Sequence, residues 1–206
     1  MDSQPPTPLR ARSQRPWLEE PSLVLRERLA GAPPGAVIKG WLFQSLGDGA
    51  RAHGVELDAG ARRLGFKDYP LAEYLEALAE AAVRVRPDLR AKETLRLLGR
   101  GVYGSFAQSL LGKVVLAGIG SGKGGARTGL QWVARVYKLT SNHATARFST
   151  LAGGPTTIVL SDVWTFPDSY HVGIFEGAAE ALGGSVSVDV ESHSLCAATL
   201  TVRWES

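Results

Sequence analysis

Four histidines and one cysteine are the residue types in this 206-residue sequence that most often serve as metal ligands. The histidines are His53, His143, His171 and His193, and none has a second histidine three or four positions away, so no helix presents a preformed ligand pair. We therefore predict no metal site and interpret the histidines as isolated surface or capping residues. Cys196 stands alone, which excludes an internal disulfide and favours a reducing compartment.

Residues 118–125 combine five glycines with one lysine, which is the composition of a phosphate-binding loop. A Walker loop needs a glycine six positions before its lysine and a hydroxyl residue directly after it. Ala117 and Gly124 occupy those positions around Lys123. Ser121 also lacks the Gly-x-Ser-x-Gly spacing of a hydrolase nucleophile. We therefore expect a flexible basic connection here and no nucleotide site.

The carboxylates are scattered along the chain, and no two of them are placed as a catalytic pair at strand ends. The sequence therefore predicts a protein without catalytic residues. The alternative is an enzyme whose site is assembled only in three dimensions, with Tyr170, His171 and Glu176 as the first candidates. Glu176 is otherwise expected to be an exposed helix residue.

The clearest structural element is a helix over residues 168–182 that leads into strands over residues 186–190 and 198–204. Asp168 or Ser169 can cap the start of this helix, and the two glycines after residue 182 are typical of a helix end. After these glycines the apolar period changes from 3.6 to 2, which is the period of a half-buried strand. Both the helix and the strands are therefore marked in the sequence.

Gly173 and Gly177 lie four residues apart on one face of that helix, which is therefore bare of side chains. We expect another backbone to pack closely against this face. The apolar residues of the neighbouring elements are expected to form the core or the wall of a ligand pocket, and core packing is the alternative role for each. The pocket candidates are Leu78, Phe106, Val114, Phe148, Phe175 and Trp204.

The rest of the chain divides into a helical half and a strand-rich half. Apolar residues recur at helical spacing over residues 37–53, 70–87 and 90–117, and they alternate over residues 144–149 and 156–161. The C-terminal half therefore has the order β-β-α-β-β. We predict an α+β fold in which an N-terminal helical half packs on a four-stranded, mainly antiparallel sheet.

Charge is divided unevenly along the chain, whose net charge is +3. Residues 84–138 carry eleven basic and two acidic residues, whereas residues 148–206 carry one basic and seven acidic residues. This segregation indicates a basic surface for nucleic acid or another polyanion, two complementary faces of a self-associating protein, or a solvated helix face. The candidates for polyanion binding are Arg84, Arg90, Lys113, Arg127, Arg135 and Lys138.

The N-terminus differs in composition from the remainder. Residues 1–19 contain four prolines and three arginines without apolar periodicity, so we expect a disordered basic tail before a single domain over residues 20–206. No apolar run reaches the roughly 18 residues of a membrane span, and the N-terminus lacks the apolar core of a signal peptide. A cytoplasmic location is the default expectation.

Several short motifs resemble a paralogous family of unknown function that is expanded in myxobacteria. They are residues 37–43 (VIKGWLF), 66–71 (FKDYPL), 95–100 (LRLLGR), 171–178 (HVGIFEGA) and 200–204 (LTVRW). The order of elements also looks like the superfamily of haem nitric-oxide-binding domains, 4-vinyl-reductase-type ligand domains and Bet3-like subunits of vesicle-tethering complexes. This resemblance implies a hydrophobic pocket between helices and sheet, frequent dimerisation, and a role in sensing or assembly.

The resemblance does not extend to the cofactor ligands. The haem-binding members place a ligating histidine after the long central helices, and residues 113–137 contain no histidine. The zinc cysteines of some 4-vinyl-reductase-type members are also missing, since Cys196 is the one cysteine. We therefore predict no cofactor and do not expect haem.

The interpretation that these observations favour is a non-enzymatic cytoplasmic sensor or assembly module. Its expected form is a homodimer that binds a small apolar ligand or a protein partner. The alternatives are binding of a polyanion or nucleic acid through residues 84–138, and the enzyme described above.

Overall fold

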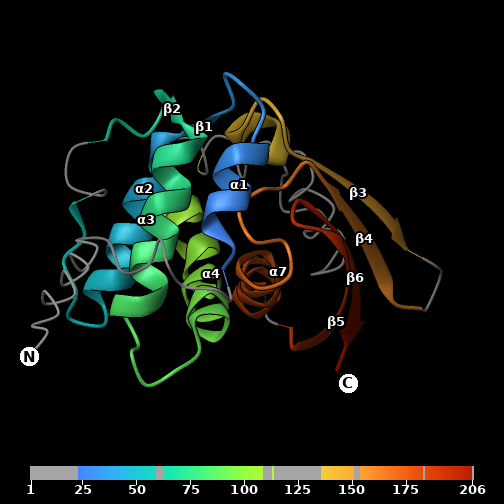
Figure 1. Cartoon of the computed structure of the whole chain (residues 1–206). Helices are drawn as coiled ribbons and strands as arrows, with labels where there is room; N and C mark the ends of the chain where they lie inside the picture. Colours follow the sequence, from blue (N-terminus) through green and yellow to red (C-terminus); the bar gives the residue numbers. More distant parts are fainter. Residues whose placement is uncertain are drawn as a thin grey trace, which may run out of the picture.

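The computed structural model describes residues 23–58, 63–108, 113, 136–150, 154–182 and 184–205. Helices lie on one side and a four-stranded antiparallel sheet on the other, which confirms the predicted α+β fold (Figure 1). Helix α7 (Tyr170–Ala181) runs between the two halves and packs against both. The molecule is therefore organised around α7.

The helical half has one continuous apolar core, to which α1, α2, α3 and α4 all contribute. The helix predicted to span residues 37–53 begins only at Gly40, because residues 37–39 are extended and pair antiparallel with residues 68–70. In chain order the elements of this half are α1 (Leu25–Gly31), β1 (Val37–Lys39), α2 (Gly40–Arg51), β2 (Asp68–Pro70), α3 (Leu71–Arg84) and α4 (Ala91–Gln108).

The sheet has the strand order β3-β4-β6-β5, with every neighbouring pair antiparallel. Alternate residues of the central strands, such as Ile158 and Leu200, are fully buried against α7, whereas their sequence neighbours are more exposed. The strands are β3 (Thr145–Thr150), β4 (Thr156–Ser161), β5 (Val186–Ser194) and β6 (Ala197–Trp204), so the predicted order β-β-α-β-β is confirmed.

Helix α7 packs on α4 at a distance that only glycine permits. A Cβ atom at Gly173 would overlap the backbone carbonyl of Arg96, and one at Gly177 would overlap that of Arg100. From the other side, a Cβ atom at Gly99 of α4 would overlap the carbonyl of Tyr170. The two backbones therefore touch along three successive glycine contacts.

The start of α7 differs from the prediction. Ser169 is the N-cap residue but makes no side-chain capping hydrogen bond, and the Asp168 carboxylate instead forms an ion pair with Lys92 Nζ at 2.5 Å. The Asp168 carboxylate therefore joins the start of α7 to α4 and does not cap the helix. At the other end the Gly184 N–H donates to the Ala179 carbonyl at 2.9 Å, and Gly183 lies outside the described residues.

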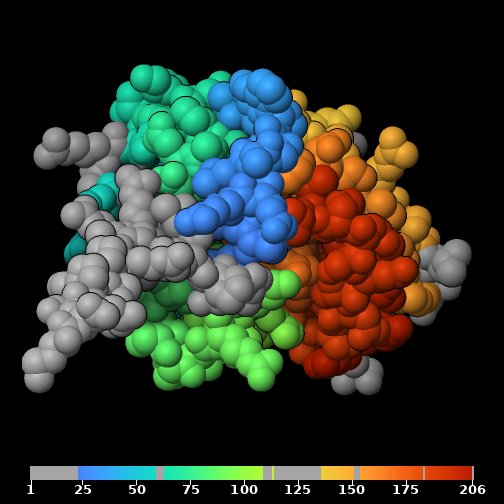
Figure 2. Space-filling view, viewed as in Figure 1, coloured from blue at the N-terminus to red at the C-terminus, as the bar shows by residue number. Residues whose placement is uncertain are grey.

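Helix α1 crosses the boundary between the two halves, as the space-filling view shows (Figure 2). The buried Arg28 side chain donates hydrogen bonds to the carbonyls of Leu23, Trp164 and Leu195, and its guanidinium stacks on the ring of Phe166 at 4.3 Å. One buried cation therefore joins α1 to the loops of the sheet half.

Several predictions fall on residues outside the described ranges. They concern the tail over residues 1–19, the glycine-rich segment over residues 118–125, and the candidates Val114, Arg127 and Arg135. Among the described helices, none is long and apolar enough to span a membrane.

Candidate functional site

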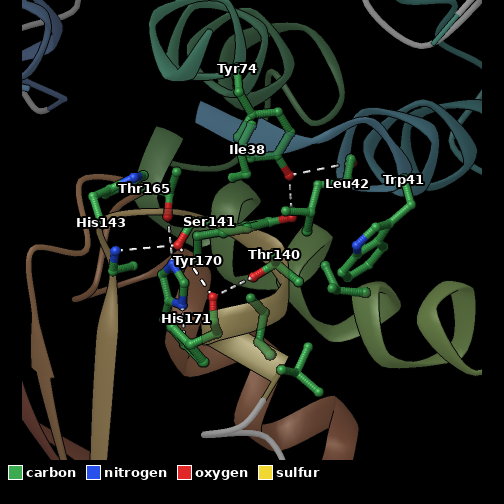
Figure 3. A pocket seen from close by; sticks show the side chains of 15 residues that line it. Ile38, Trp41, Leu42, Tyr74, Thr140, Ser141, His143, Thr165, Tyr170 and His171 are labelled. Atoms are coloured by element: carbon green, nitrogen blue, oxygen red, sulfur yellow. Dashed lines mark hydrogen bonds between the residues drawn. The ribbon is translucent and has the colours of Figure 1, made fainter. Parts of the chain in front are cut away.

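A cavity of about 60 Å³ lies between the helical half and the start of α7 (Figure 3). Helices α2, α3 and α4 form one side of it, and residues 136–144 together with the loop before α7 form the other. This volume has room for a few water molecules or a very small ligand. The lining residues are Ile38, Trp41, Leu42, Tyr74, Val102, Val136, Tyr137, Thr140, Ser141, His143, Ala144, Thr165, Tyr170, His171 and Ile174.

The helical wall of the cavity is apolar except for the Trp41 indole and the Tyr74 hydroxyl. Trp41 is only 5% exposed and packs against Phe106, with their ring centroids 5.3 Å apart. Its Nε1–H is buried and has no hydrogen-bond partner among the described residues. Because a buried donor without a partner costs about 1–3 kcal/mol, this N–H indicates a place where a ligand could accept a hydrogen bond.

The opposite wall carries a buried hydrogen-bonded group centred on His171. Its Nδ1 shares a hydrogen bond with the Tyr137 hydroxyl, and its Nε2 shares one with Thr165 Oγ1 at 2.7 Å. Burial, with a smaller contribution from the Arg28 charge, lowers the pKa of His171 to about 3. The imidazole is therefore neutral at pH 7, and the prediction that His171 is a surface or capping residue was wrong.

Two further tyrosines meet above this group. The hydroxyls of Tyr74 and Tyr170 lie 2.7 Å apart, and both side chains are fully buried. Burial raises the pKa of each phenol well above its usual value, so both remain protonated at physiological pH. Uncharged hydroxyls and one neutral imidazole thus line part of a cavity whose remaining lining is mostly apolar.

His143 stands at the edge of the cavity, directly before β3. Its Nδ1 lies 3.2 Å from the side-chain oxygen of Asn142. The same oxygen accepts the Val37 N–H at 2.9 Å, and the Asn142 amide nitrogen donates to the Gly35 carbonyl at 3.0 Å. Burial lowers the pKa of His143, so this imidazole is also neutral at pH 7. The segment before β1 therefore holds Asn142, which in turn orients His143.

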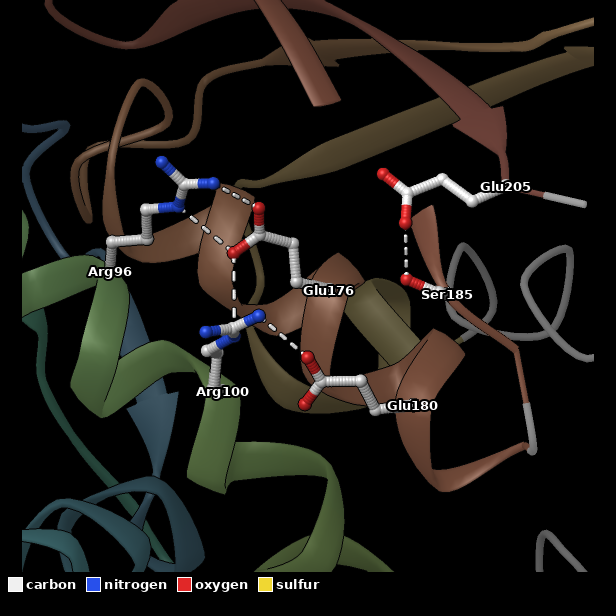
Figure 4. Close-up of polar contacts among 6 residues, drawn as sticks. All are labelled: Arg96, Arg100, Glu176, Glu180, Ser185 and Glu205. Carbon is white, nitrogen blue, oxygen red and sulfur yellow. Dashed lines mark hydrogen bonds and ion pairs between the residues drawn. The ribbon is translucent and has the colours of Figure 1, made fainter. Parts of the chain in front are cut away.

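Glu176 does not line the cavity, because it faces α4 (Figure 4). Its carboxylate accepts a hydrogen bond from Arg96 Nε at 2.9 Å and lies 3.5 Å from Arg100 Nε, while Glu180 pairs with Arg100 at 2.6 Å. Glu176 is 2% exposed, so the expectation of an exposed helix residue was wrong. Of the three enzyme candidates, the structure brings Tyr170 and His171 together and leaves Glu176 elsewhere.

This ion-pair cluster allows a direct test of how α4 and α7 are joined. We expect Glu176→Gln to lower the free energy of unfolding by about 1 kcal/mol, because a buried carboxylate loses its charge while its two arginines remain half exposed. Glu180→Gln is the matched control, and it should change stability by less than about 0.5 kcal/mol because Glu180 is exposed. Urea denaturation of both variants measures the difference, and equal effects would contradict this assignment.

The five predicted pocket residues that the structure describes lie outside the cavity lining. Leu78 and Phe106 belong to the core of the helical half, Phe175 is buried between α7 and the sheet, and Phe148 and Trp204 pack against the same sheet core. Apolar periodicity identifies which residues are buried, but it does not tell which of them border a space. His143, which does border it, stands directly before the strand predicted over residues 144–149, and that boundary is the signal that could have found it.

The described basic candidates lie on exposed surface. Arg84 forms an ion pair with Glu80 one turn earlier on α3, whereas Arg90, Lys113 and Lys138 are exposed. Polyanion binding through these residues stays a prediction.

The architecture described above is similar to that of H-NOX proteins. The H-NOX protein from S. oneidensis in its Fe(II)NO ligation state superposes with a TM-score of 0.62 at 13% identity, covering 82% of this chain and 100% of that chain. The unliganded Fe(II) H-NOX protein from K. algicida gives 0.58 at 12% identity, covering 82% and 97%. A structure described as modulating haem redox potential through porphyrin distortion gives 0.56 at 14% identity, covering 81% and 92%.

The sequence itself matches a narrower group. The chain belongs to the family described as Protein of unknown function (DUF2378), whose model matches residues 34–205. Both parts of the resemblance seen in the sequence, to a family of unknown function and to the haem nitric-oxide-binding superfamily, are therefore confirmed. No curated protein matches the sequence at a significant level.

These similarities overturn the prediction that the protein takes no cofactor and that haem is not expected. That prediction rested on one segment, residues 113–137, which lacks a histidine. The similar folds, however, are those of proteins described with ferrous iron and, in one structure, with haem. Histidines outside that segment border the cavity, so the missing histidine was not a sufficient reason to set haem aside.

Proposed function

We propose that this chain is a ligand-binding sensor domain that holds a small molecule in the cavity between α2, α3, α4 and the start of α7. The observation that carries the proposal is the Trp41 indole N–H, a buried donor without a partner among the described residues at the wall of that cavity. Native proteins rarely leave such a donor unsatisfied. A bound molecule with a hydrogen-bond acceptor would satisfy it.

The chemistry of the walls defines what the ligand must offer. Contacts with Ile38, Leu42, Val102 and Ile174 favour an apolar surface on the ligand. The buried charged residues Arg28 and Glu176 lie outside the lining. The imidazoles of His143 and His171, which border the cavity, are neutral. We therefore infer an uncharged or mostly apolar ligand with at least one acceptor atom near Trp41.

One of these residues suits haem: a neutral imidazole, which is the commonest protein ligand of haem iron, borders the cavity at His143. A cavity of about 60 Å³ does not hold a porphyrin as it stands, so haem binding would require the helical wall and the start of α7 to move apart. A ligand of a few atoms fits without such a change. A sensor domain of this kind recognises its signal by binding and carries out no reaction of its own.

The position of α7 supports a role in signalling. The residues at its start, Tyr170 and His171, border the cavity, and its middle packs on the sheet through Val172 and Phe175. A ligand that displaced the start of the helix would therefore change its packing on the sheet. A homodimer, or a partner protein that reads this change, remains part of the proposal.

Substitution of Trp41 tests the proposal. Trp41→Phe keeps a ring beside Phe106 but removes the N–H, so the fraction of purified protein that retains a small molecule should fall, corresponding to roughly three- to tenfold weaker binding. The ligand-free protein should be equally stable or slightly more stable, because an unsatisfied buried donor has gone. Native mass spectrometry measures the retained mass and, in the same spectrum, the number of subunits.

Trp204→Phe is the matched control, because Trp204 Nε1 is also buried without a partner among the described residues but lies outside the cavity lining. This variant should retain as much ligand as the wild type. Equal retention by all three proteins would contradict the assignment of Trp41 to a ligand site.

A further inference from the structure

One wall of the cavity is less buried than the others. The lining residues that are half-buried are Val136, Ser141, His143, Ala144 and Ile174, whereas the other lining residues are buried. Four of these five belong to residues 136–144, the segment that faces the helical wall across the cavity. The way from solvent into the cavity therefore leads past this segment.

Residues 136–144 are joined to α7 and to the sheet by buried or repeated contacts. The Tyr137 hydroxyl shares a buried hydrogen bond with His171 Nδ1, and its ring stacks on Phe175 with the ring centroids 6.4 Å apart. Directly after the segment, β3 pairs with β4 along its whole length. The segment is therefore fixed to the sheet half of the molecule.

The contacts of the same segment with the helical half are more exposed. Ser141 forms one β-bridge with β1, and Val136 packs on the helical core. Among the described residues, the only side-chain hydrogen bonds between the segment and the helical half come from Asn142, which is exposed. Its Oδ1 accepts the Val37 N–H at 2.9 Å, and its Nδ2 donates to the Gly35 carbonyl at 3.0 Å. Hydrogen bonds in contact with water open most readily.

A turn before β1 presents one of the groups that Asn142 binds. The Ala36 N–H donates to the Pro33 carbonyl at 3.0 Å, which closes a β-turn, and Gly35 has a φ of +74° at its third position. Proline at the second position and glycine at the third are the residues that favour a type II turn. The Gly35 carbonyl is therefore held in place by the local sequence.

We propose that residues 136–144 form a gate through which a ligand enters the cavity, and that Asn142 is the latch that holds this gate closed against β1. This inference rests on the proposed function, because it describes how the ligand of the same cavity is admitted. When the two hydrogen bonds of Asn142 break, Ser141 and His143 move away from the helical half and uncover the cavity. Loss of the latch raises the rates of entry and release by the same factor, so it shortens the residence time of the ligand without changing the affinity.

The experiment measures how often the gate opens and needs no ligand. In the full-length protein, Thr140→Cys places a thiol in the cavity lining, at a position that is 8% exposed, and Cys196→Ser removes the native thiol. The probe is methyl methanethiosulfonate, a small uncharged thiol reagent, and mass spectrometry follows the labelling. Adding Asn142→Ala to this parent protein should raise the labelling rate about tenfold, because two exposed hydrogen bonds are lost.

Gln44→Ala in the same parent protein is the matched control. Gln44 is also exposed, and its side-chain amide donates to the Arg63 carbonyl at 2.6 Å, so it joins α2 to a neighbouring loop. It lies outside the cavity lining. This variant should be labelled at the rate of the parent protein.

Hydrogen exchange distinguishes opening of the gate from loosening of the whole domain. In a protein that carries Asn142→Ala alone, the amides of residues 136–144 should exchange about tenfold faster than in the wild type. The amides of β4 should keep their wild-type rates, because β4 has a neighbour on each side in the sheet. Equal acceleration in both regions would show that Asn142 stabilises the whole domain and would overturn its role as a latch.

Two labelling results would also overturn the proposal. If Asn142→Ala leaves the labelling rate unchanged, Asn142 does not hold the gate. If the parent protein is labelled as fast as its urea-unfolded form, the gate is never closed. Native mass spectrometry of the wild type distinguishes these results from a failure of the proposed function, because labelling as expected in a protein that retains no small molecule would contradict the ligand site and leave the gate in place.

Discussion

Gly173→Ala should lower the free energy of unfolding by about 2–4 kcal/mol, a large part of the stability of a domain this size. The physical reason is that the new methyl group would overlap the backbone carbonyl of Arg96, and backbone cannot rotate away as a flexible side chain can. The helices α4 and α7 would have to separate along their whole contact. Chemical denaturation followed by circular dichroism measures the loss.

Gly104→Ala provides the control within α4. No atom of the described residues lies within 4 Å of a Cβ atom built at Gly104, so alanine meets no obstacle among them. Because alanine is a better helix former than glycine, this variant should be unchanged or up to about 1 kcal/mol more stable. Similar destabilisation by Gly173→Ala and Gly104→Ala would show that helix propensity, and not close packing, determines the effect.

The second large effect is a loss of stability in mild acid that depends on His171. The pKa of His171 is about 3 in the folded protein and about 6.5 in the unfolded chain. Between these two pH values the unfolded chain therefore binds a proton at this residue and the folded protein does not. Stability contributed by the neutral imidazole is complete above pH 6.5 and decreases as the pH falls from 6.5 towards 3. At pH 5 the expected loss relative to pH 7 is about 2 kcal/mol.

Carboxylates also titrate in this range, so the measurement must be a difference between proteins. His171→Asn removes the ionisable group, and its stability should fall by about 2 kcal/mol less than that of the wild type between pH 7 and pH 5. His193→Asn should keep the wild-type dependence, because His193 is exposed. Parallel pH profiles for wild type and His171→Asn would show that His171 is not held neutral.

The fold could be predicted largely from local patterns. Alternation around Ile158 and Leu200 marks the strands, helical periodicity in residues 70–87 marks α3, and the order of these elements defines the architecture. These features are local because burial of one face fixes the period of the sequence. The strand pairing of residues 37–39 with 68–70 was missed, since such short strands show no clear alternation.

The site could not be predicted in the same way, because its residues come from distant parts of the chain. Trp41 is followed by apolar residues whereas Tyr170 lies between Ser169 and His171, and nothing local shows that both border the same space. The neutrality of His171 depends on burial and on Arg28, which lies far away in the sequence. The buried Glu176 was missed for a similar reason, since its two arginines belong to another helix.

The cofactor prediction was wrong because it treated one missing histidine as decisive. Residues 113–137 contain no histidine, but a cavity is formed by the fold and can receive a ligating side chain from a different segment. His143 comes from the turn before β3, and its ring is oriented by Asn142 and the segment before β1. Ligand chemistry therefore has to be judged from the assembled cavity.

The most direct test of the central claim is a crystal structure of the wild-type protein with whatever molecule it retains through purification. A ligand-binding sensor domain should show non-protein density in the cavity, with an acceptor atom about 3 Å from Trp41 Nε1. A cavity that contains only water, or a retained molecule bound elsewhere on the surface, would contradict the proposal.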